Sequence, residues 1–319
     1  MSTVRPQWIV FGTTSVPPRP RRPPDARLAT RDNARLTTPA GKTETDSPRH
    51  AGDSITQQGS SPANGWVSIL QDTYARKVDI VNRGYSGYNT RVAKLILPHL
   101  VPRVVDDDSV DGAPTLCTIF FGANDAALPD RTSGKQHVSL EVYVNNLRSM
   151  VTYLRKEAGV RRVVLIAPPP VSEAHRVVHA KEKYGVDLVL GSERTVEMTG
   201  KYAAACKGLA AELGVPCVDL WSRFVGVEGY GDRLLNDGLH LTAEGNGLVA
   251  EAVLEVLKGL KLDAEEMAAD MPSWDAMLLE GGEGLSEAML EDAANKVLRE
   301  HLKGTGRWNA ANDWSGSRR

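Results

Sequence analysis

The stretch "LCTIFFG" (residues 116–122) has apolar side chains at almost every position and ends in glycine. A strand that faces solvent on one side alternates apolar and polar residues, whereas a strand that is covered on both faces is apolar nearly throughout. The stretch therefore predicts a buried strand of a parallel sheet.

Four further stretches have the same character, and helical patterns separate them. The predicted strands are "PQWIVFG" (6–12), "DIVNRG" (79–84), "RRVVLIAPPP" (161–170) and "VPCVDLW" (215–221). Apolar residues recur at helical spacing over 66–74, 140–154, 198–213 and 243–260, the last with Thr242 as the expected N-cap. This alternation predicts an α/β protein with a three-layer α/β/α fold around a central parallel five-stranded sheet.

Length and composition favour one globular domain with an appendage. The 319 residues are 41% apolar and 24% charged, as in ordinary globular proteins. We assign residues 1–262 to the domain and 263–319 to an acidic extension with one helix at about Leu285 to Leu302. The net charge of −2 gives no electrostatic argument for binding nucleic acid or a membrane surface.

The cysteines and the N-terminus bear on the compartment. Cys117, Cys206 and Cys217 are an odd number without a Cys-x-x-Cys spacing, so they indicate neither a disulfide framework nor a zinc site. We expect buried thiols in a reducing compartment. Residues 1–8 lack the apolar core of a signal peptide, and no apolar run reaches the length of a membrane span. These features predict a cytoplasmic protein.

Polar residues that suit catalysis follow the predicted strands. In parallel α/β sheets, ligands bind beyond the carboxyl ends of the strands. The candidates are Ser54 in "HAGDSITQQG" (50–59), Gly87 in "NRGYSGYNTR" (82–91), Asn124 in "FGANDA" (121–126), and Asp237 and His240 in "NDGLHLT" (236–242).

These residue types fit the parts of a serine hydrolase. A serine hydroxyl needs a base to take its proton, and an imidazole such as that of His240 suits this task. Asp237 can orient the ring and stabilise its charged form. Attack on an ester creates an oxyanion, for which the backbone N–H groups of Ser54 and Gly87 and the side-chain amide of Asn124 are candidate donors.

Each feature also has a purely structural interpretation. Gly-Asp-Ser is a common turn, Asn124 and Asp125 fit a turn followed by a helix cap, and Asp237 and His240 can cap the helix expected near Ala243. Catalysis is favoured because all of these residues follow strands, in one order along the chain.

Together, "GDSITQQG", "NRGYSGYNTR", "FFGANDA", "APPP" and "DGLHLT" resemble the sequence blocks of the GDSL or SGNH hydrolase family, most closely its isoamyl acetate-hydrolysing esterase branch. The resemblance spans about residues 52–260 together with the strand at 7–11. It implies a flavodoxin-like fold, no metal or organic cofactor, and an acyl-serine intermediate. It also implies that Ser54 is the nucleophile and first oxyanion donor, that Gly87 and Asn124 are the other donors, and that Asp237 and His240 complete the triad.

Residues 13–51 differ from the rest of the chain. They hold seven of the eighteen prolines, seven arginines and no aromatic residue, with a net charge of +4, so we expect disorder. In the family, the first strand runs directly into the Gly-Asp-Ser turn, and deleting 12–51 here would give "PQWIVFGDSITQQG". We hypothesise that 12–51 is a translated intron or a gene-model error; a real loop insertion is the alternative.

The sequence therefore predicts a serine esterase that acts on a small, short-chain ester, such as an acetate of a small alcohol, without a cofactor. Residues 171–192 can shape the pocket but are not assigned to the site. An esterase-like protein impaired by the 12–51 insertion is one alternative. A metal-dependent phosphoesterase is another, because four residues are also metal-ligand types: Asp53, Asn124, Asp125 and His240. Acyl and alcohol preference and homo-oligomerisation stay open.

Overall fold

The structure is a computed structural model that describes residues 7–12, 53–103, 115–185, 187–188, 190–277 and 286–304. The insertion predicted at 13–51 lies outside the described residues. Its disorder and its origin therefore stay predictions.

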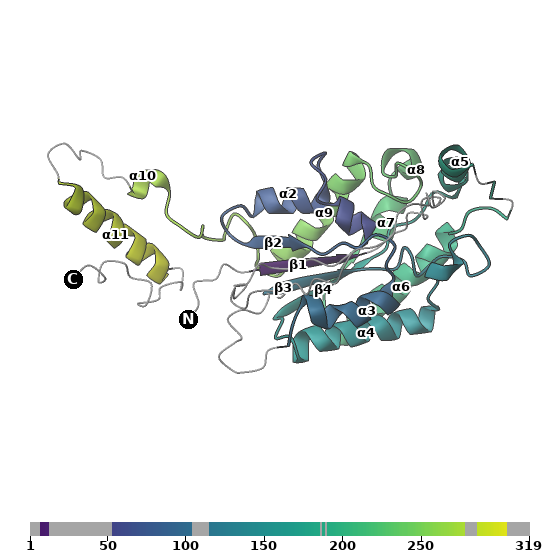
Figure 1. Ribbon diagram of the computed structural model, residues 1–319, viewed down its shortest axis with the longest axis horizontal. Coiled ribbons are helices and arrows are strands. Elements are labelled where there is room, and N and C mark those ends of the chain that lie inside the picture. Colours follow the sequence, from purple (N-terminus) through teal and green to yellow (C-terminus); the bar gives the residue numbers. More distant parts are fainter. Residues whose placement is uncertain are drawn as a thin grey trace, which may run out of the picture.

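The described strands form one parallel sheet in the order β2-β1-β3-β4-β5 (Figure 1). β1, the second strand in this order, pairs with β2 on one side and with β3 on the other, where Gly12 lies opposite Phe120. The α/β class with a parallel sheet is confirmed, and each predicted strand is present: β1 Gln7–Gly12, β2 Asp79–Asn82, β3 Leu116–Phe120, β4 Arg162–Ala167 and β5 Cys217–Asp219.

The prediction for the last strand is wrong at its carboxyl end. β5 stops at Asp219 instead of continuing to residue 221. The Asp219 side chain accepts a hydrogen bond from the backbone N–H of Ser222 and so caps α7 (Leu220–Val225), which begins at the next residue. The apolar residues Leu220 and Trp221 therefore belong to a helix.

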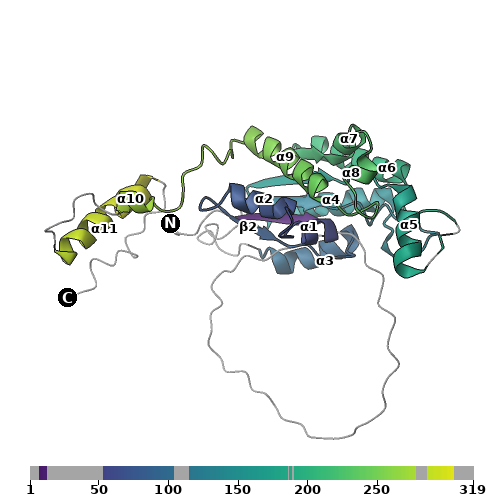
Figure 2. The same ribbon diagram turned by 90° about the horizontal axis from the view of Figure 1, so that it is seen from above.

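Helices lie on both faces of the sheet (Figures 1 and 2). On one face α2 (Trp66–Thr73) packs against α9 (Ala243–Gly259). On the other, α4 (Leu140–Lys156) packs between α3 (Thr90–Leu100) and α6 (Val196–Leu213). Helices α2, α4, α6 and α9 agree with the predicted patterns, and Thr242 is the N-cap of α9, as expected. Helix α3 and helix α5 (Glu173–Tyr184) were not predicted.

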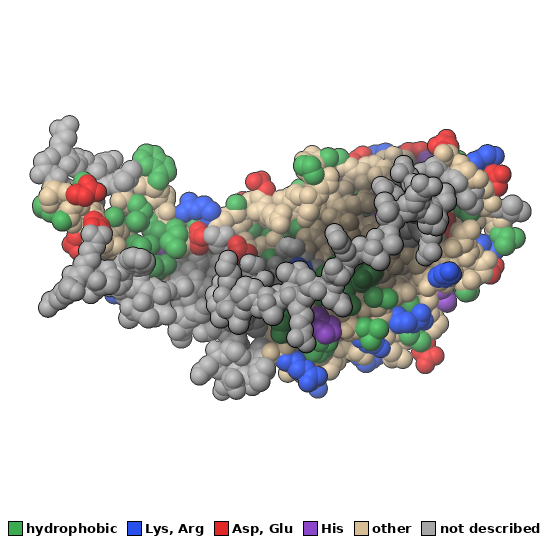
Figure 3. Space-filling view, in the orientation of Figure 1, with side chains coloured by type: hydrophobic (Ala, Val, Ile, Leu, Met, Phe, Trp, Pro, Cys, Tyr) green, Lys and Arg blue, Asp and Glu red, His purple; other side chains and the backbone are tan. Residues whose placement is uncertain are grey.

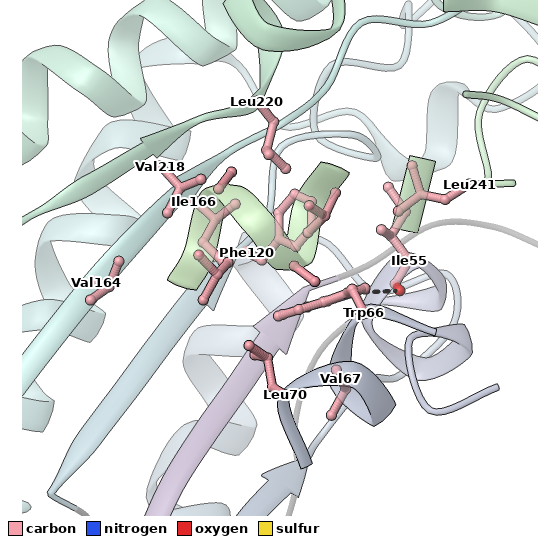
Figure 4. Close-up of a cluster of buried hydrophobic side chains, with 14 of the residues drawn as sticks. Ile55, Trp66, Val67, Leu70, Phe120, Val164, Ile166, Val218, Leu220 and Leu241 are labelled. Carbon is pink, nitrogen blue, oxygen red and sulfur yellow. Dashed lines mark hydrogen bonds between the residues drawn. The ribbon is translucent and has the colours of Figure 1, made fainter. Parts of the chain in front are cut away.

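Strand β3 contributes to two buried clusters, one on each side of the sheet. Leu116 and Phe120 belong to the cluster with α2 and α9, which Figure 4 shows, whereas Cys117, Ile119 and Phe121 belong to the cluster with α4 and α6. Alternate side chains of a strand point to opposite faces, so burial of both sets is the reason that "LCTIFFG" is apolar at almost every position.

A tryptophan connects this core to the segment that carries Ser54. Trp66 is fully buried, and its ring meets Phe120 edge to face with centroids 6.1 Å apart. Its Nε1–H donates a 3.2 Å hydrogen bond to the backbone oxygen of Ile55 in α1 (Ser54–Gln58), drawn dashed in Figure 4. The short α1 is thereby fixed to the packed interior.

The three thiols are free. Cys117 and Cys206 are buried, as expected, whereas Cys217 is partly exposed at the start of β5. No helix within the described residues is long and apolar enough to cross a bilayer.

The described part of the C-terminal extension contains α10 (Trp274–Met277) and α11 (Glu287–Gly304), which lie away from the sheet in Figures 1 and 2. Helix α11 corresponds to the helix expected at Leu285 to Leu302. The boundary at residue 262 stays a prediction. Over the face seen in Figure 3, Lys and Arg side chains are interspersed with Asp and Glu.

Candidate active site

Ser54 is the first residue of α1, a helix that contacts β1. The preceding residue, Asp53, has an extended backbone, and its Oδ1 accepts the backbone N–H of Thr56 at 3.1 Å, which makes it the N-cap. Backbone N–H groups in the first turn of a helix have no acceptor within the helix. The Ser54 N–H lies in this first turn, so an acceptor for it must come from outside the helix.

Ser54, His240 and Asp237 form a continuous chain of hydrogen bonds. The Ser54 Oγ lies 2.8 Å from Nε2 of His240, and Nδ1 of His240 lies 2.7 Å from Oδ2 of Asp237. An ionised carboxylate can only accept a hydrogen bond, so Nδ1 carries the ring proton and Nε2 accepts from the serine hydroxyl. In this tautomer the histidine can remove the serine proton.

The Asp237 carboxylate is held by its own turn and by an arginine. Its Oδ1 accepts the backbone N–H groups of Leu239 at 3.0 Å and His240 at 2.8 Å, and its Oδ2 lies 3.2 Å from the Arg176 guanidinium. Burial by itself raises the pKa of Asp237, but the hydrogen bonds and charge of His240, together with the charge of Arg176, outweigh it and lower that pKa below its usual range. The carboxylate is ionised at neutral pH.

The interpretation of Asp237 and His240 as caps of the following helix is wrong. The N-cap of α9 is Thr242, whose Oγ1 accepts the N–H of Gly245 at 3.1 Å. The Asp237 carboxylate instead bonds within the turn that holds His240, and the turn needs a glycine because Gly238 has φ +81°.

The Asn124 amide is oriented by partners on both of its ends. Its Oδ1 accepts a hydrogen bond from Arg194 at 2.9 Å, and its Nδ2 donates to the backbone oxygen of Tyr88 at 2.8 Å. The next residue, Asp125, accepts from the backbone N–H and the hydroxyl of Thr90, the first residue of α3. Asp125 thus bonds to the start of α3. The Asn124 side chain does not take part in these hydrogen bonds and is held by Arg194 and Tyr88 instead.

Gly87 lies in a turn with φ +85°, which L side chains rarely adopt. Its carbonyl oxygen accepts a hydrogen bond from Nε2 of Gln136 at 3.1 Å. The three expected oxyanion donors therefore lie at the start of α1 and in the loops that follow β2 and β3.

Two further carboxyl groups are buried close to these loops. Burial raises the pKa of Asp125 to about 6, although the hydrogen bonds from Thr90 lower it in part. Burial also raises the pKa of Asp53 well above its usual value, with a further contribution from the charge of Asp125. Both groups favour the protonated form more than an exposed carboxyl does.

The residues that a metal-dependent alternative would use as ligands have other partners. The Asn124 oxygen faces the Arg194 cation, and Nε2 of His240 faces the serine hydroxyl. Asp53 and Asp125 use one oxygen each to bind helix N–H groups. Among the described residues, no three His, Cys, Asp or Glu side chains gather as a metal site would require. The hydrogen bonds of these four side chains suit a serine–histidine–aspartate arrangement better than they suit a metal ion.

Sequence reasoning missed the polar residues that support the site. These are buried or partly buried side chains from α5, from the segment between α5 and α6, and from the loop after β3: Arg176, Glu193, Arg194 and Gln136. They do not stand directly at a strand end and have no motif spacing, so only their burial in the fold identifies them.

The histidines between residues 171 and 192 lie in different surroundings. His175 bonds to the Ser172 hydroxyl and, 3.0 Å away, to Asp232 at the surface. His179 Nε2 lies 3.7 Å from Oδ2 of Asp237. This segment therefore reaches the triad carboxylate through one of its two histidines.

Comparisons with known proteins identify the family of the chain. Residues 51–248 match the model of the GDSL-like lipase/acylhydrolase family. The chain is 48% identical over 221 residues to a GDSL esterase/lipase of Arabidopsis thaliana, which covers 69% of this chain and 89% of the relative. It is 46% identical over 199 residues to an isoamyl acetate-hydrolyzing esterase 1 homolog of Bos taurus, which covers 62% of this chain and 76% of the relative.

Among solved structures, the fold is similar to that of the acetyl xylan esterase AlAXEase. The TM-score is 0.51 at 16% sequence identity, over 79% of this chain and 99% of the other. At this identity the likeness concerns the fold alone.

Proposed function

The chain belongs to the GDSL-like lipase/acylhydrolase family, and on that premise we propose that it hydrolyses short-chain carboxylic esters through an acyl intermediate on Ser54. Family membership makes it a serine ester hydrolase; the residue roles and the substrate are the proposal. The observation that carries it is the hydrogen-bond chain from Ser54 through His240 to Asp237, at 2.8 and 2.7 Å.

In the first half of the reaction, Nε2 of His240 takes the hydroxyl proton while Ser54 Oγ attacks the ester carbonyl carbon. The carbonyl oxygen becomes an oxyanion, which the N–H groups of Ser54, Gly87 and Asn124 stabilise. Asp237 stabilises the imidazolium. His240 then gives its proton to the alkoxy oxygen, the bond to the alcohol breaks, and the acyl group stays on the serine.

In the second half, water takes the place of the alcohol. Nε2 of His240 removes a proton from this water as it attacks the acyl carbon, and the same donors hold the second oxyanion. When the intermediate collapses, the proton returns to Ser54 Oγ and the carboxylic acid leaves. The same groups therefore serve both steps, and no cofactor enters the scheme.

The preference for short esters is supported by the relatives. Homologs in Bos taurus and Homo sapiens, 46% and 43% identical, are named for isoamyl acetate, an acetate of a small alcohol. We propose a substrate of this class for this chain. We also propose the cytoplasm as its compartment, on the basis of the two buried thiols.

One experiment tests the proposal and its rivals together. Hydrolysis of p-nitrophenyl esters from acetate to palmitate is measured for the wild type and for Ser54→Ala, with and without EDTA. We expect the highest kcat/KM for acetate or butyrate, loss of activity in Ser54→Ala, and no effect of EDTA. Activity that EDTA abolishes would show that hydrolysis depends on a metal and would contradict the serine mechanism, and an inactive wild type would favour the impaired esterase.

A further inference from the structure

We propose that Arg194 is a positioning residue for the oxyanion hole: its single guanidinium orients the Asn124 amide directly and the Gly87 turn through Gln136. The inference rests on the proposed function, because it assigns a task to the surroundings of that site. Arg194 lies just before α6 in the sequence and is 0% exposed.

The contacts of Arg194 converge on the loop after β3. Its Nε donates to the backbone oxygen of Ala123 at 2.7 Å, and one terminal nitrogen donates both to Oδ1 of Asn124 at 2.9 Å and to Oε1 of Gln136 at 2.8 Å. A guanidinium has donors only, arranged in a rigid plane. It can therefore hold three oxygens in fixed places.

This arrangement decides which way the Asn124 amide faces. Because Arg194 can only donate, the oxygen end of the amide must face it, and the nitrogen end must face the opposite way. One N–H is held by Tyr88, and we assign the other to the oxyanion. A charged donor on the amide oxygen also polarises the amide, so its N–H becomes a stronger donor.

The same logic applies to Gln136 and the Gly87 turn. Arg194 fixes the oxygen end of the Gln136 amide, so Nε2 points away and donates to the Gly87 carbonyl at 3.1 Å. Glycine adopts positive φ as readily as negative φ, so the Gln136 contact with the Gly87 carbonyl is what holds this peptide in one orientation. One cation therefore sets two of the three proposed donors.

Glu193 connects this cation to the triad. Its Oε1 accepts from Arg194 at 3.0 Å and from Arg176 at 3.0 and 2.5 Å, and Arg176 in turn lies 3.2 Å from Oδ2 of Asp237. Two buried cations thus face two buried carboxylates. Burial lowers the pKa of Arg194 to about 10, so the guanidinium is charged at neutral pH.

A double-mutant cycle on p-nitrophenyl acetate tests the inference. Arg194→Lys keeps the charge but loses the fork, and we expect kcat to fall about 100-fold, as for loss of an oxyanion donor, with KM within about threefold of the wild type. In the Asn124→Ala background the same substitution should lower kcat by about tenfold or less, because only the Gly87 branch remains. Arg148→Lys is the matched control, since that exposed arginine pairs with Glu212.

An equal loss from Arg194→Lys in both backgrounds, at wild-type Tm, would overturn the inference, because a general structural role has no reason to depend on Asn124. If Arg194→Lys does not fold, Gln136→Met takes its place. We expect it to lower kcat about tenfold in either background with KM preserved. An unchanged kcat in Gln136→Met would contradict the Gly87 branch.

Failure of the proposed function has a different signature. Full activity in Ser54→Ala would remove the serine mechanism, whatever Arg194 does. An inactive Ser54→Ala together with wild-type kcat in Arg194→Lys would leave the mechanism intact and reject the positioning role alone.

Discussion

The hydroxyl oxygen of Ser54 lies 2.8 Å from Nε2 of His240, although the two residues are 186 positions apart in the sequence. Ser54 begins α1, the helix that contacts β1, and His240 lies in the turn before α9. Formation of the parallel sheet brings their segments to the same edge. The chemistry proposed here therefore depends on the whole domain being folded.

The triad carboxylate is the first test of this geometry. In the wild type, both carboxylate oxygens of Asp237 accept N–H donors. In Asp237→Asn an amide NH₂ group replaces one of these oxygens. The amide cannot hold His240 in the tautomer that removes a proton, so we expect kcat to fall about 10,000-fold. Steady-state hydrolysis of p-nitrophenyl acetate measures it.

The control for this variant is Asp232→Asn, since Asp232 also bonds a histidine, His175, but at the surface. Its kcat should equal that of the wild type. Similar losses in both variants would show that Asp237 has no special position in the reaction.

The turn at Gly87 gives a second test. Gly87→Ala places a side chain at φ +85°, where the backbone must shift and move the proposed N–H donor. We expect kcat to fall about 10- to 100-fold with KM nearly unchanged. Gly185→Ala is the matched control, because Gly185 has φ +64° and open space around it at the end of α5.

Both glycine variants should lose similar stability, so their Tm values should agree within a few degrees. If Gly185→Ala lowers kcat as much as Gly87→Ala, backbone strain alone accounts for the loss and Gly87 is not an oxyanion donor.

The buried Asp125 predicts how stability depends on pH. Its pKa in the folded state is raised to about 6, above the value of an unfolded chain, so the fold favours the protonated form. Stability from this group is present below about pH 4 and is lost as the pH rises through about 6.

Asp125→Asn keeps an oxygen for the two Thr90 donors but cannot ionise. We compare the free energy of unfolding of the variant with that of the wild type at each pH. Between pH 4 and pH 8 this difference should shift in favour of the variant by on the order of 2 kcal/mol. Urea unfolding at a series of pH values measures the difference. If the free energy of unfolding depends on pH in the same way for the two proteins, Asp125 does not titrate in this range.

The sequence was informative where a pattern repeats and uninformative where a side chain is held by the fold alone. The strand pattern of residues 116–122 and the N-cap Thr242 depend on local rules, and both were predictable. The end of β5 was misplaced because Asp219 as a helix cap competes with an apolar run. The positions of Glu193 and Arg194 depend on contacts with distant segments, which no spacing reveals.

The insertion is tested by removing it. Strand β1 pairs within the sheet up to Gly12, and α1, which starts at Ser54, contacts that strand. A chain with 12–51 deleted can therefore pass directly from strand to helix. We expect this form to have a higher kcat on p-nitrophenyl acetate, because a direct connection holds Ser54 more rigidly than a long one. Equal or lower turnover in the shortened form would contradict this.

Covalent labelling of the proposed nucleophile shows directly whether His240 activates Ser54. The wild type is treated with a fluorophosphonate probe, digested and analysed by mass spectrometry beside Ser54→Ala and His240→Ala. We expect one probe per chain on Ser54, slow labelling in His240→Ala, and none in Ser54→Ala. Labelling at another residue, or equal labelling in Ser54→Ala, would contradict a mechanism in which His240 activates this serine.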